Sequence, residues 1–369
     1  MAQDSQDIAG IAGLFCFEGS LAAAAPFGLG HINDTYLVTY RQPDGTLRRY
    51  ILQRINQFVF KNPAELMENI ERVTRHLHDK IVAAGGDPLR ETLNLVPARD
   101  QRSYARDAQG EYWRAFLFIE NARTYESAES PEHIFQAARA FGNFQRQLAD
   151  FPARKLHETI PFFHDTPRRF RAFQEAVQRD AFGRAAAVRA EIHFLEQREA
   201  DTHVLVEGIA GGTLPLRVTH NDTKFNNVMI DDRSAKAVCI LDLDTVMPGL
   251  ALYDFGDAVR SGAALAAEDE PDNTRAGLSL EIFDHLAHGY LDAARDFLTP
   301  AELDLLAFSA RLITLEQAIR FLGDYLNGDI YYKVHRPGHN LDRARTQIGM
   351  LRDMETRFAD MQAVIAKYR

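Results

Sequence analysis

Residues 218–230 read VTHNDTKFNNVMI, and residues 237–244 read AVCILDLD. The apolar, β-prone letters that end the first segment and begin the second predict two short strands, with Asp231 and Asp232 at the turn between them. A further apolar run leads into the polar residues. The stretch therefore consists of one acidic, amide-rich loop bracketed by apolar strands, and a second pair of carboxylates follows the last strand.

The polar residues of this stretch have the spacing H-x-D-x-x-x-x-N, followed by an aspartate after the next strand, which is the spacing of a kinase catalytic loop. Phosphoryl transfer from ATP requires a carboxylate that orients the attacking hydroxyl and accepts its proton, and oxygen ligands that hold Mg²⁺ against the phosphates. The spacing assigns the first role to Asp222 and the second to Asn227 and Asp242. Lys224 would bring positive charge to the transferring phosphoryl group. A polar β-hairpin loop is the alternative, but the register of all three positions argues against it.

The strings HNDTK at 220–224 and DLDTVMPG at 242–249 also suggest a family. On these residues the chain resembles the aminoglycoside phosphotransferase and choline kinase superfamily, and within it most resembles the N-acetylhexosamine 1-kinases. The resemblance implies an α+β, bilobal protein-kinase-like fold, ATP and Mg²⁺ as cofactors, and a sugar that is phosphorylated on its anomeric hydroxyl. It also implies that the sugar is held by these side chains: His31, Asp222, Asp242, Arg320 and Tyr331.

The N-terminal third predicts a small lobe of antiparallel strands. Residues 27–38 read FGLGHINDTYLV and predict a glycine turn between two strands, and a hairpin at Pro43-Asp44-Gly45 then leads to a third strand at 50–55. This is the order of the first three strands of a kinase small lobe. Gly28 and Gly30 would let the backbone approach the phosphates of ATP.

Two features of this turn leave alternatives open. Asn33 stands at the third position of G-x-G-x-x-G, so an ordinary hairpin turn would explain the two glycines equally well. His31 at the tip is either a solvated turn histidine or the sugar contact that the resemblance implies.

Arg54 occupies the third-strand position at which protein kinases carry a phosphate-binding lysine, and a guanidinium keeps the charge while adding a fork of donors. Residues 62–65 then predict a helix start, with an N-cap, a proline at N1 and an acid at N3, ahead of an apolar stripe from Leu66 to Ile81. Glu65 lies nearest that stripe and is the predicted partner of Arg54, with an ordinary capping role as the alternative.

Strands at 93–98 and 111–119 should complete a sheet of about five strands. Phe118 and Ile119 would then begin the hinge, where backbone amides bind adenine. We expect a small nucleotide-binding lobe at residues 1–120, and a large catalytic and substrate-binding lobe over 121–369.

The second lobe is predicted to be mostly helical. Helices are expected from Ser130 to about Ala149, over 161–200, from Thr299 to about Tyr325, and as one last helix over 340–369. The segment 161–200 is rich in Arg and Glu, and it is either an insertion that covers the substrate or a solvated face.

Asp254-Phe255-Gly256 has the letters of the metal-binding D-F-G of protein kinases. It follows a turn, whereas Asp242 directly follows a strand, so Asp242 keeps that assignment. Asp254 and Asp257 are predicted to be structural, hydrogen-bonding acids near the site.

Composition limits the function classes. The chain has 369 residues, of which 46% are hydrophobic, and this length predicts two or three domains. The formal charge of −10, with no basic block, disfavours nucleic acid and membrane surfaces as partners. Two cysteines outside any C-x-x-C pair, the absence of a long apolar run and the acidic start favour a cytoplasmic protein, which we expect to be a monomer or a small homo-oligomer.

Two other functions stay open. One is a kinase of another small alcohol or amino compound, such as choline, glucosamine or an aminoglycoside, although the single tryptophan, Trp113, gives little support for a choline-binding aromatic cage. The other is a catalytically dead nucleotide-binding regulator, which would have no chemical need for Asp222, Asn227 and Asp242 together.

Overall fold

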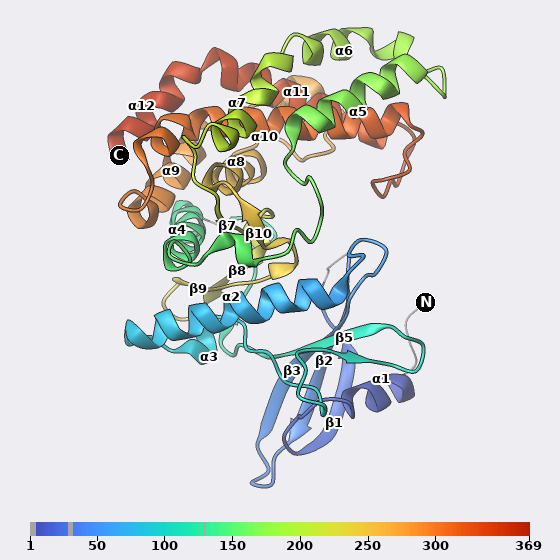
Figure 1. Ribbon diagram of the computed structural model, residues 1–369, viewed down its shortest axis with the longest axis vertical. Helices are drawn as coiled ribbons and strands as arrows, with labels where there is room; N and C mark the ends of the chain where they lie inside the picture. The colour runs from blue at the N-terminus through green and yellow to red at the C-terminus, as the bar shows by residue number, and fades with distance from the viewer. Residues whose placement is uncertain (1–4, 29–31, 129) are drawn as a thin grey trace.

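The computed structural model describes residues 5–28, 32–128 and 130–369, with side chains from Ile8 onward. Gly30 and His31, which were predicted to contact nucleotide and sugar, lie outside the described residues. The chain folds into a lobe built on an antiparallel sheet and a larger, mostly helical lobe (Figure 1). The α+β, bilobal protein-kinase-like architecture predicted from the sequence is confirmed.

The described residues of the small lobe form a five-stranded antiparallel sheet in the order β1-β2-β3-β5-β4. Its strands are β1 (Ser20–Pro26), β2 (Asp34–Arg41), β3 (Leu47–Arg54), β4 (Ala105–Arg106) and β5 (Tyr112–Leu117). Successive side chains of a strand point to opposite faces. The face that carries Leu52 and Trp113 packs against α1 (Ser5–Ala12), and the face that carries Ile51 and Phe116 packs toward α2 (Pro63–Ala83).

Helix α2 lies between the sheet and the strands of the catalytic stretch (Figure 1). Pro63 begins the helix and Glu65 lies in its first turn, as predicted, but in the described part of the chain the side chain of Asn62 makes no capping hydrogen bond. The predicted apolar stripe is buried and shares one core with Val228 and Ile240 of the large lobe. This shared core seats the small lobe on the strands that carry the candidate site.

The large lobe is built from helices around one apolar core. Its helices are α4 (Pro131–Gln147), α5 (Thr166–Arg179), α6 (Arg189–Glu196), α7 (Glu199–Ala210), α8 (Ala251–Gly262), α9 (Leu280–Ala294), α10 (Pro300–Leu326), α11 (His339–Thr356) and α12 (Phe358–Tyr368), and the short α3 (Pro88–Glu91) precedes them. Within the described ranges, every helix is too short or too polar to cross a membrane.

Two small sheets carry the catalytic stretch. One pairs β7 (Arg217–Thr219) with β10 (Met247–Gly249), and the other joins β6 (Ala122–Arg123), β8 (Val228–Asp231) and β9 (Ala237–Ile240). The two strands predicted on either side of the Asp231-Asp232 turn are therefore present as β8 and β9.

The predicted helix starts at Ser130 and Thr299 are confirmed. The Ser130 side chain accepts a hydrogen bond from the backbone N–H of His133. Thr299 and Glu302 form a complete capping box, and Glu302 also makes an ion pair with Arg217 of β7. This pair fixes the start of α10 to the strand that enters the catalytic loop.

Two sequence predictions of elements were wrong in part. Residues 93–98 form no continuous strand, because Pro97 has no N–H to continue a ladder. They make isolated bridges from Leu95 to Phe116 and from Ala98 to Phe15 and a few backbone bonds to β5, and β4 occupies the sheet edge instead. The last helix is divided at Arg357, whose side chain donates to the carbonyl of Leu278, and α12 then packs along α9.

Candidate active site

An acid on α8 holds the loop that follows β7. The carboxylate of Asp254 accepts hydrogen bonds from the backbone N–H groups of His220 (2.9 Å) and Asn221 (2.7 Å), and the amide of Gln145 on α4 also donates to it. Asn221 has a positive φ of 65°, a conformation that these bonds help to maintain. Asp254 is therefore a buried positioning acid, as predicted, and burial raises its pKa.

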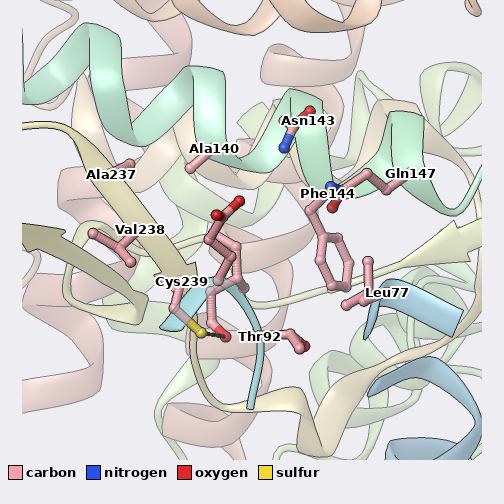
Figure 2. A pocket seen from close by; sticks show the side chains of 11 residues that line it. Leu77, Thr92, Ala140, Asn143, Phe144, Gln147, Ala237, Val238 and Cys239 are labelled. Atoms are coloured by element: carbon pink, nitrogen blue, oxygen red, sulfur yellow. Dashed lines mark hydrogen bonds between the residues drawn. The ribbon is translucent and has the colours of Figure 1, made fainter. Parts of the chain in front are cut away.

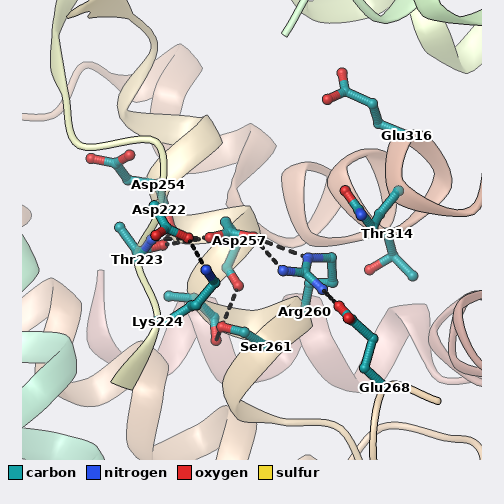
Figure 3. A network of polar contacts seen from close by, with 12 residues as sticks. Asp222, Thr223, Lys224, Asp254, Asp257, Arg260, Ser261, Glu268, Thr314 and Glu316 are labelled. Carbon is teal, nitrogen blue, oxygen red and sulfur yellow. Dashed lines mark hydrogen bonds and ion pairs between the residues drawn. The ribbon is translucent and has the colours of Figure 1, made fainter. Parts of the chain in front are cut away.

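Asp257, one turn further along α8, supports the same loop (Figure 3). One carboxylate oxygen accepts from the backbone N–H of Thr223 at 3.0 Å, and the other accepts two hydrogen bonds from Arg260. Arg260 also pairs with Glu268 at 3.1 Å. This buried network confirms the structural role predicted for Asp257.

The three predicted catalytic-loop residues are in mutual contact. Lys224 Nζ lies 2.7 Å from a carboxylate oxygen of Asp222, and the amide of Asn227 donates to the backbone carbonyl of Asp222 (2.8 Å) and to its carboxylate (3.1 Å). Burial by itself would lower the pKa of Lys224, but the charges of Asp222 and Asp257 raise it above its usual value. Lys224 therefore stays charged beside the carboxylate.

Asp242 directly follows β9 and has a left-handed backbone, with φ 55°. Desolvation by the surrounding protein, together with the charges of Asp244 and Asp222, raises its pKa to about 6, although the residue is exposed at the surface. A solvent-accessible carboxylate close to two others is electrostatically suited to a cation. In the described part of the chain no three His, Cys, Asp or Glu side chains are grouped as a complete metal site. A magnesium ion would therefore take Asp242 and Asn227 together with phosphate oxygens, as is usual for this ion.

A buried ion pair across the lobes was missed by sequence reasoning. Both nitrogens of the Arg114 fork on β5 donate to the carboxylate of Asp244, and each side chain is only 3% exposed. Asn33, at the end of the glycine turn, also donates to Asp244 at 2.7 Å. The available signal was the arginine inside the otherwise apolar and aromatic strand YWRAFL.

Arg54 has a different partner from the predicted one. It makes an ion pair with Asp34, its cross-strand neighbour on β2, and not with Glu65. Arg54 also lies opposite Trp113, on the sheet face that packs against α1, whereas its neighbour Gln53 accepts from Arg114 on the other face. Its contact with ATP phosphates stays a prediction, and this placement argues against it.

The remaining predicted nucleotide contacts lie close together. Gly28 has a φ of 78°, which favours glycine. Phe27 beside it packs edge-on against Phe118, with ring centroids 5.8 Å apart, and Ile119 is buried against β8 and β9. The glycine turn and the predicted hinge are thus neighbours.

Arg320 and Tyr331, the predicted sugar contacts, also lie together. Arg320 on α10 donates to Gln317 at 3.1 Å, and its guanidinium lies 5.7 Å from the ring centroid of Tyr332. Tyr331 interacts with Arg320 and is exposed. The segment before α5 completes the surroundings with the ring of Phe163.

A cavity of about 100 Å³ lies elsewhere, among α2, α3, α4 and β9 (Figure 2). Its lining includes Glu91, Asn143 and Gln147, and the buried hydroxyl of Thr92 has no hydrogen-bond partner in the described residues. None of the predicted site residues lines it. The cavity borders Ile240 and so lies behind the strand that leads to Asp242.

Comparison with known proteins supports a phosphotransferase function for this chain. Residues 23–305 match the model of the phosphotransferase enzyme family, which covers most of the chain. This span includes both the glycine turn and all of the catalytic stretch.

Solved structures share the fold at low identity. A microcompartment-associated aminopropanol kinase is 17% identical with a TM-score of 0.61, and the match covers 97% of this chain and 99% of that one. An aminoglycoside phosphotransferase from Alicyclobacillus acidocaldarius is 14% identical with a TM-score of 0.59, covering 100% and 96%. A choline kinase from Cryptosporidium parvum is 14% identical with a TM-score of 0.55, covering 98% of each chain. These likenesses show the fold over the whole chain.

Proposed function

The chain belongs to the phosphotransferase enzyme family, and we propose that it is a kinase that uses ATP and Mg²⁺ to phosphorylate the anomeric hydroxyl of an N-acetylhexosamine. The observation that carries this proposal is the joint arrangement of Asp222, Lys224 and Asn227 on one loop, with Asp242 within electrostatic reach of Asp222. The product would be the sugar 1-phosphate.

In the proposed reaction Asp222 orients the acceptor hydroxyl and accepts its proton. Lys224 stays charged beside it and stabilises negative charge on the transferring group. Asn227 and Asp242 would hold Mg²⁺, which neutralises phosphate charge when bound. Asp254 and Asp257 keep the loop in place through its backbone N–H groups.

We assign nucleotide binding to the small lobe, residues 1–120. The backbone at Gly28 and Gly30 would approach the phosphates, and the segment at Phe118 and Ile119 would bind adenine through its amides. The large lobe, residues 121–369, would supply the catalytic loop and the acceptor site. The proposed sugar contacts are Arg320 and Tyr331 from that lobe, and His31 from the glycine turn.

A steady-state assay of ADP release with ATP, Mg²⁺ and either N-acetylglucosamine or N-acetylgalactosamine tests the proposal. Phosphorus NMR of the product would identify the phosphorylated hydroxyl. Choline, glucosamine and an aminoglycoside serve as alternative acceptors in the same assay. The absence of any sugar-dependent release of ADP would refute the proposed function.

A further inference from the structure

Two neighbouring arginines in the large lobe have no carboxylate partner among the residues that the structure describes. Arg169 lies on α5 and Arg320 on α10, and both are partly withdrawn from water. Within the described ranges, no carboxylate oxygen comes within 4 Å of either guanidinium. Both contact Phe163, since Arg169 donates to its backbone carbonyl at 3.0 Å and the Arg320 guanidinium lies 5.6 Å from its ring centroid. We call Arg169 and Arg320 the arginine pair.

The nearest acid is already committed elsewhere. Glu316 is buried one turn before Arg320, and its two carboxylate oxygens accept from His164 Nδ1 at 2.9 Å and from the hydroxyl of Thr166 at 2.6 Å. It contributes to the field at both arginines but contacts neither of them. With one carboxylate for two guanidiniums, the cluster keeps an excess positive charge.

The arginine pair has more N–H donors than the described neutral acceptors in contact with it can satisfy. Arg169 gives Nε and Nη2 to the backbone carbonyl of Phe163, and Arg320 gives one nitrogen to Gln317 and also makes a hydrogen bond with the side chain of Tyr331. A guanidinium has five N–H donors. His164 Nε2 is also buried without a partner among the described residues. Several donors in this cluster thus have no acceptor from the described protein.

The charges of the cluster also favour a bound anion. Burial lowers the pKa of Arg169, and the charge of Arg320 lowers it further. Two like charges in a partly desolvated place are unfavourable unless an anion joins them, and paired guanidiniums suit the planar oxygens of a carboxylate or a phosphate. A neutral hydroxyl or carbonyl would take a hydrogen bond without supplying the missing charge.

We propose that the acceptor carries an anionic group, a carboxylate or a phosphate, which binds between Arg169 and Arg320. This inference rests on the proposed function, and it narrows the acceptor to an acidic derivative of an N-acetylhexosamine. The exposed Tyr331 and the half-buried Tyr332 beside Arg320 would line the approach to this group. Arg169 then becomes a specificity-determining residue that sequence reasoning did not single out.

Acceptor charge is the variable that tests the inference. We would measure kcat/KM for N-acetylglucosamine, N-acetylmuramic acid and N-acetylglucosamine 6-phosphate, so that the two acidic compounds separate carboxylate from phosphate. The kcat/KM of at least one acidic compound should exceed that of the neutral sugar by about tenfold or more, which is the effect expected of one charge-assisted contact. Raising the ionic strength from about 0.05 M to about 0.5 M should increase KM for the acidic acceptor and not for the neutral one.

Variants assign the preference to the arginine pair. Arg169→Gln should reduce the acidic-to-neutral ratio of kcat/KM to within about threefold and remove its salt dependence, whereas Arg169→Lys should restore part of it. Arg171→Gln is the matched control, because Arg171 is an exposed arginine of the same helix and its substitution should leave the ratio unchanged.

The possible outcomes are distinguishable. If neutral N-acetylhexosamines are phosphorylated as well as their acidic derivatives, and Arg169→Gln affects both equally, the inference is overturned while the proposed function stands. If no sugar of either charge is phosphorylated, the proposed function itself fails.

Discussion

At the scale of single residues, substitution of Asp222 gives the most direct test of the proposed catalytic mechanism. Asp222→Asn should reduce kcat by ~10²–10⁴-fold, because an amide cannot accept the proton of the acceptor hydroxyl. The melting temperature should stay close to that of the wild type, since the amide can still contact Asn227 and Lys224. Steady-state kinetics and a thermal melt measure both quantities. Asp296→Asn, which changes an exposed acid, should behave as the wild type, and near-normal turnover of Asp222→Asn would remove the assigned role.

Arg114 is the residue whose loss should cost most stability. Arg114→Met leaves the buried carboxylate of Asp244 without its charged partner and should lower the free energy of unfolding by about 3–5 kcal/mol. Urea denaturation would measure the change.

Arg102→Met supplies the comparison, because Arg102 pairs with Asp100 at the surface, where solvent screens the pair and its contribution to stability is small. A loss at Arg114 no greater than the loss at Arg102 would contradict the importance of the buried pair.

The residues that were predictable are close together in the chain. Asp222, Lys224 and Asn227 belong to one loop, so their spacing alone indicates their contact. Arg114 and Asp244 are separated by 130 positions, and no local pattern pairs them. The partner of Arg54 was mispredicted because Asp34 is its neighbour across two strands, a relation set by sheet register and not by a helical wheel.

At the scale of helices and strands, α4 and α9 pack unusually closely because of glycine. A Cβ on Gly289 would lie 2.2 Å from the carbonyl oxygen of Phe135, and one on Gly142 would lie 2.6 Å from that of Tyr290. Gly289→Ala should therefore destabilise the protein by about 1–3 kcal/mol, as overpacking usually does.

Gly10→Ala in α1 is the control, because no described atom outside the neighbouring residues and the backbone of its own helix lies within 4 Å of the added methyl group. Alanine there should stabilise the helix by about 0.5–1 kcal/mol. Chemical denaturation compares the two variants, and equal effects of the same sign would contradict the packing argument.

Elements with strong local signals were predictable, whereas elements defined by tertiary contacts were not. Proline at N1 marks the starts of α2, α4 and α10, and the capping side chains of Ser130 and Thr299 support the last two. The break between α11 and α12 has no glycine or proline to announce it, and Arg357 there bonds to a distant carbonyl. The edge strand β4 is only two residues long, which gives no periodic signal.

At the scale of the whole molecule, the two lobes share a core and should unfold together. Val73 of α2 and Val228 of β8 are fully buried in the same apolar cluster, although they belong to different lobes. Calorimetry should show one cooperative transition, and Val73→Ala and Val228→Ala should both shift it downward. Two resolved transitions, each moved by only one of these variants, would show that the lobes are independent.

Asn33 connects the glycine turn to the turn that carries Asp242. The side-chain NH₂ of Asn33 donates to Asp244, and its side-chain oxygen Oδ1 accepts from the backbone N–H of Asn56 after β3. If nucleotide and metal bind at the proposed sites, we expect these hydrogen bonds to link the two binding equilibria, and such a linkage is reciprocal by thermodynamic necessity. The factor by which bound metal raises the affinity for nucleotide must equal the factor by which bound nucleotide raises the affinity for metal. Asn33→Ala should reduce these two coupling factors equally.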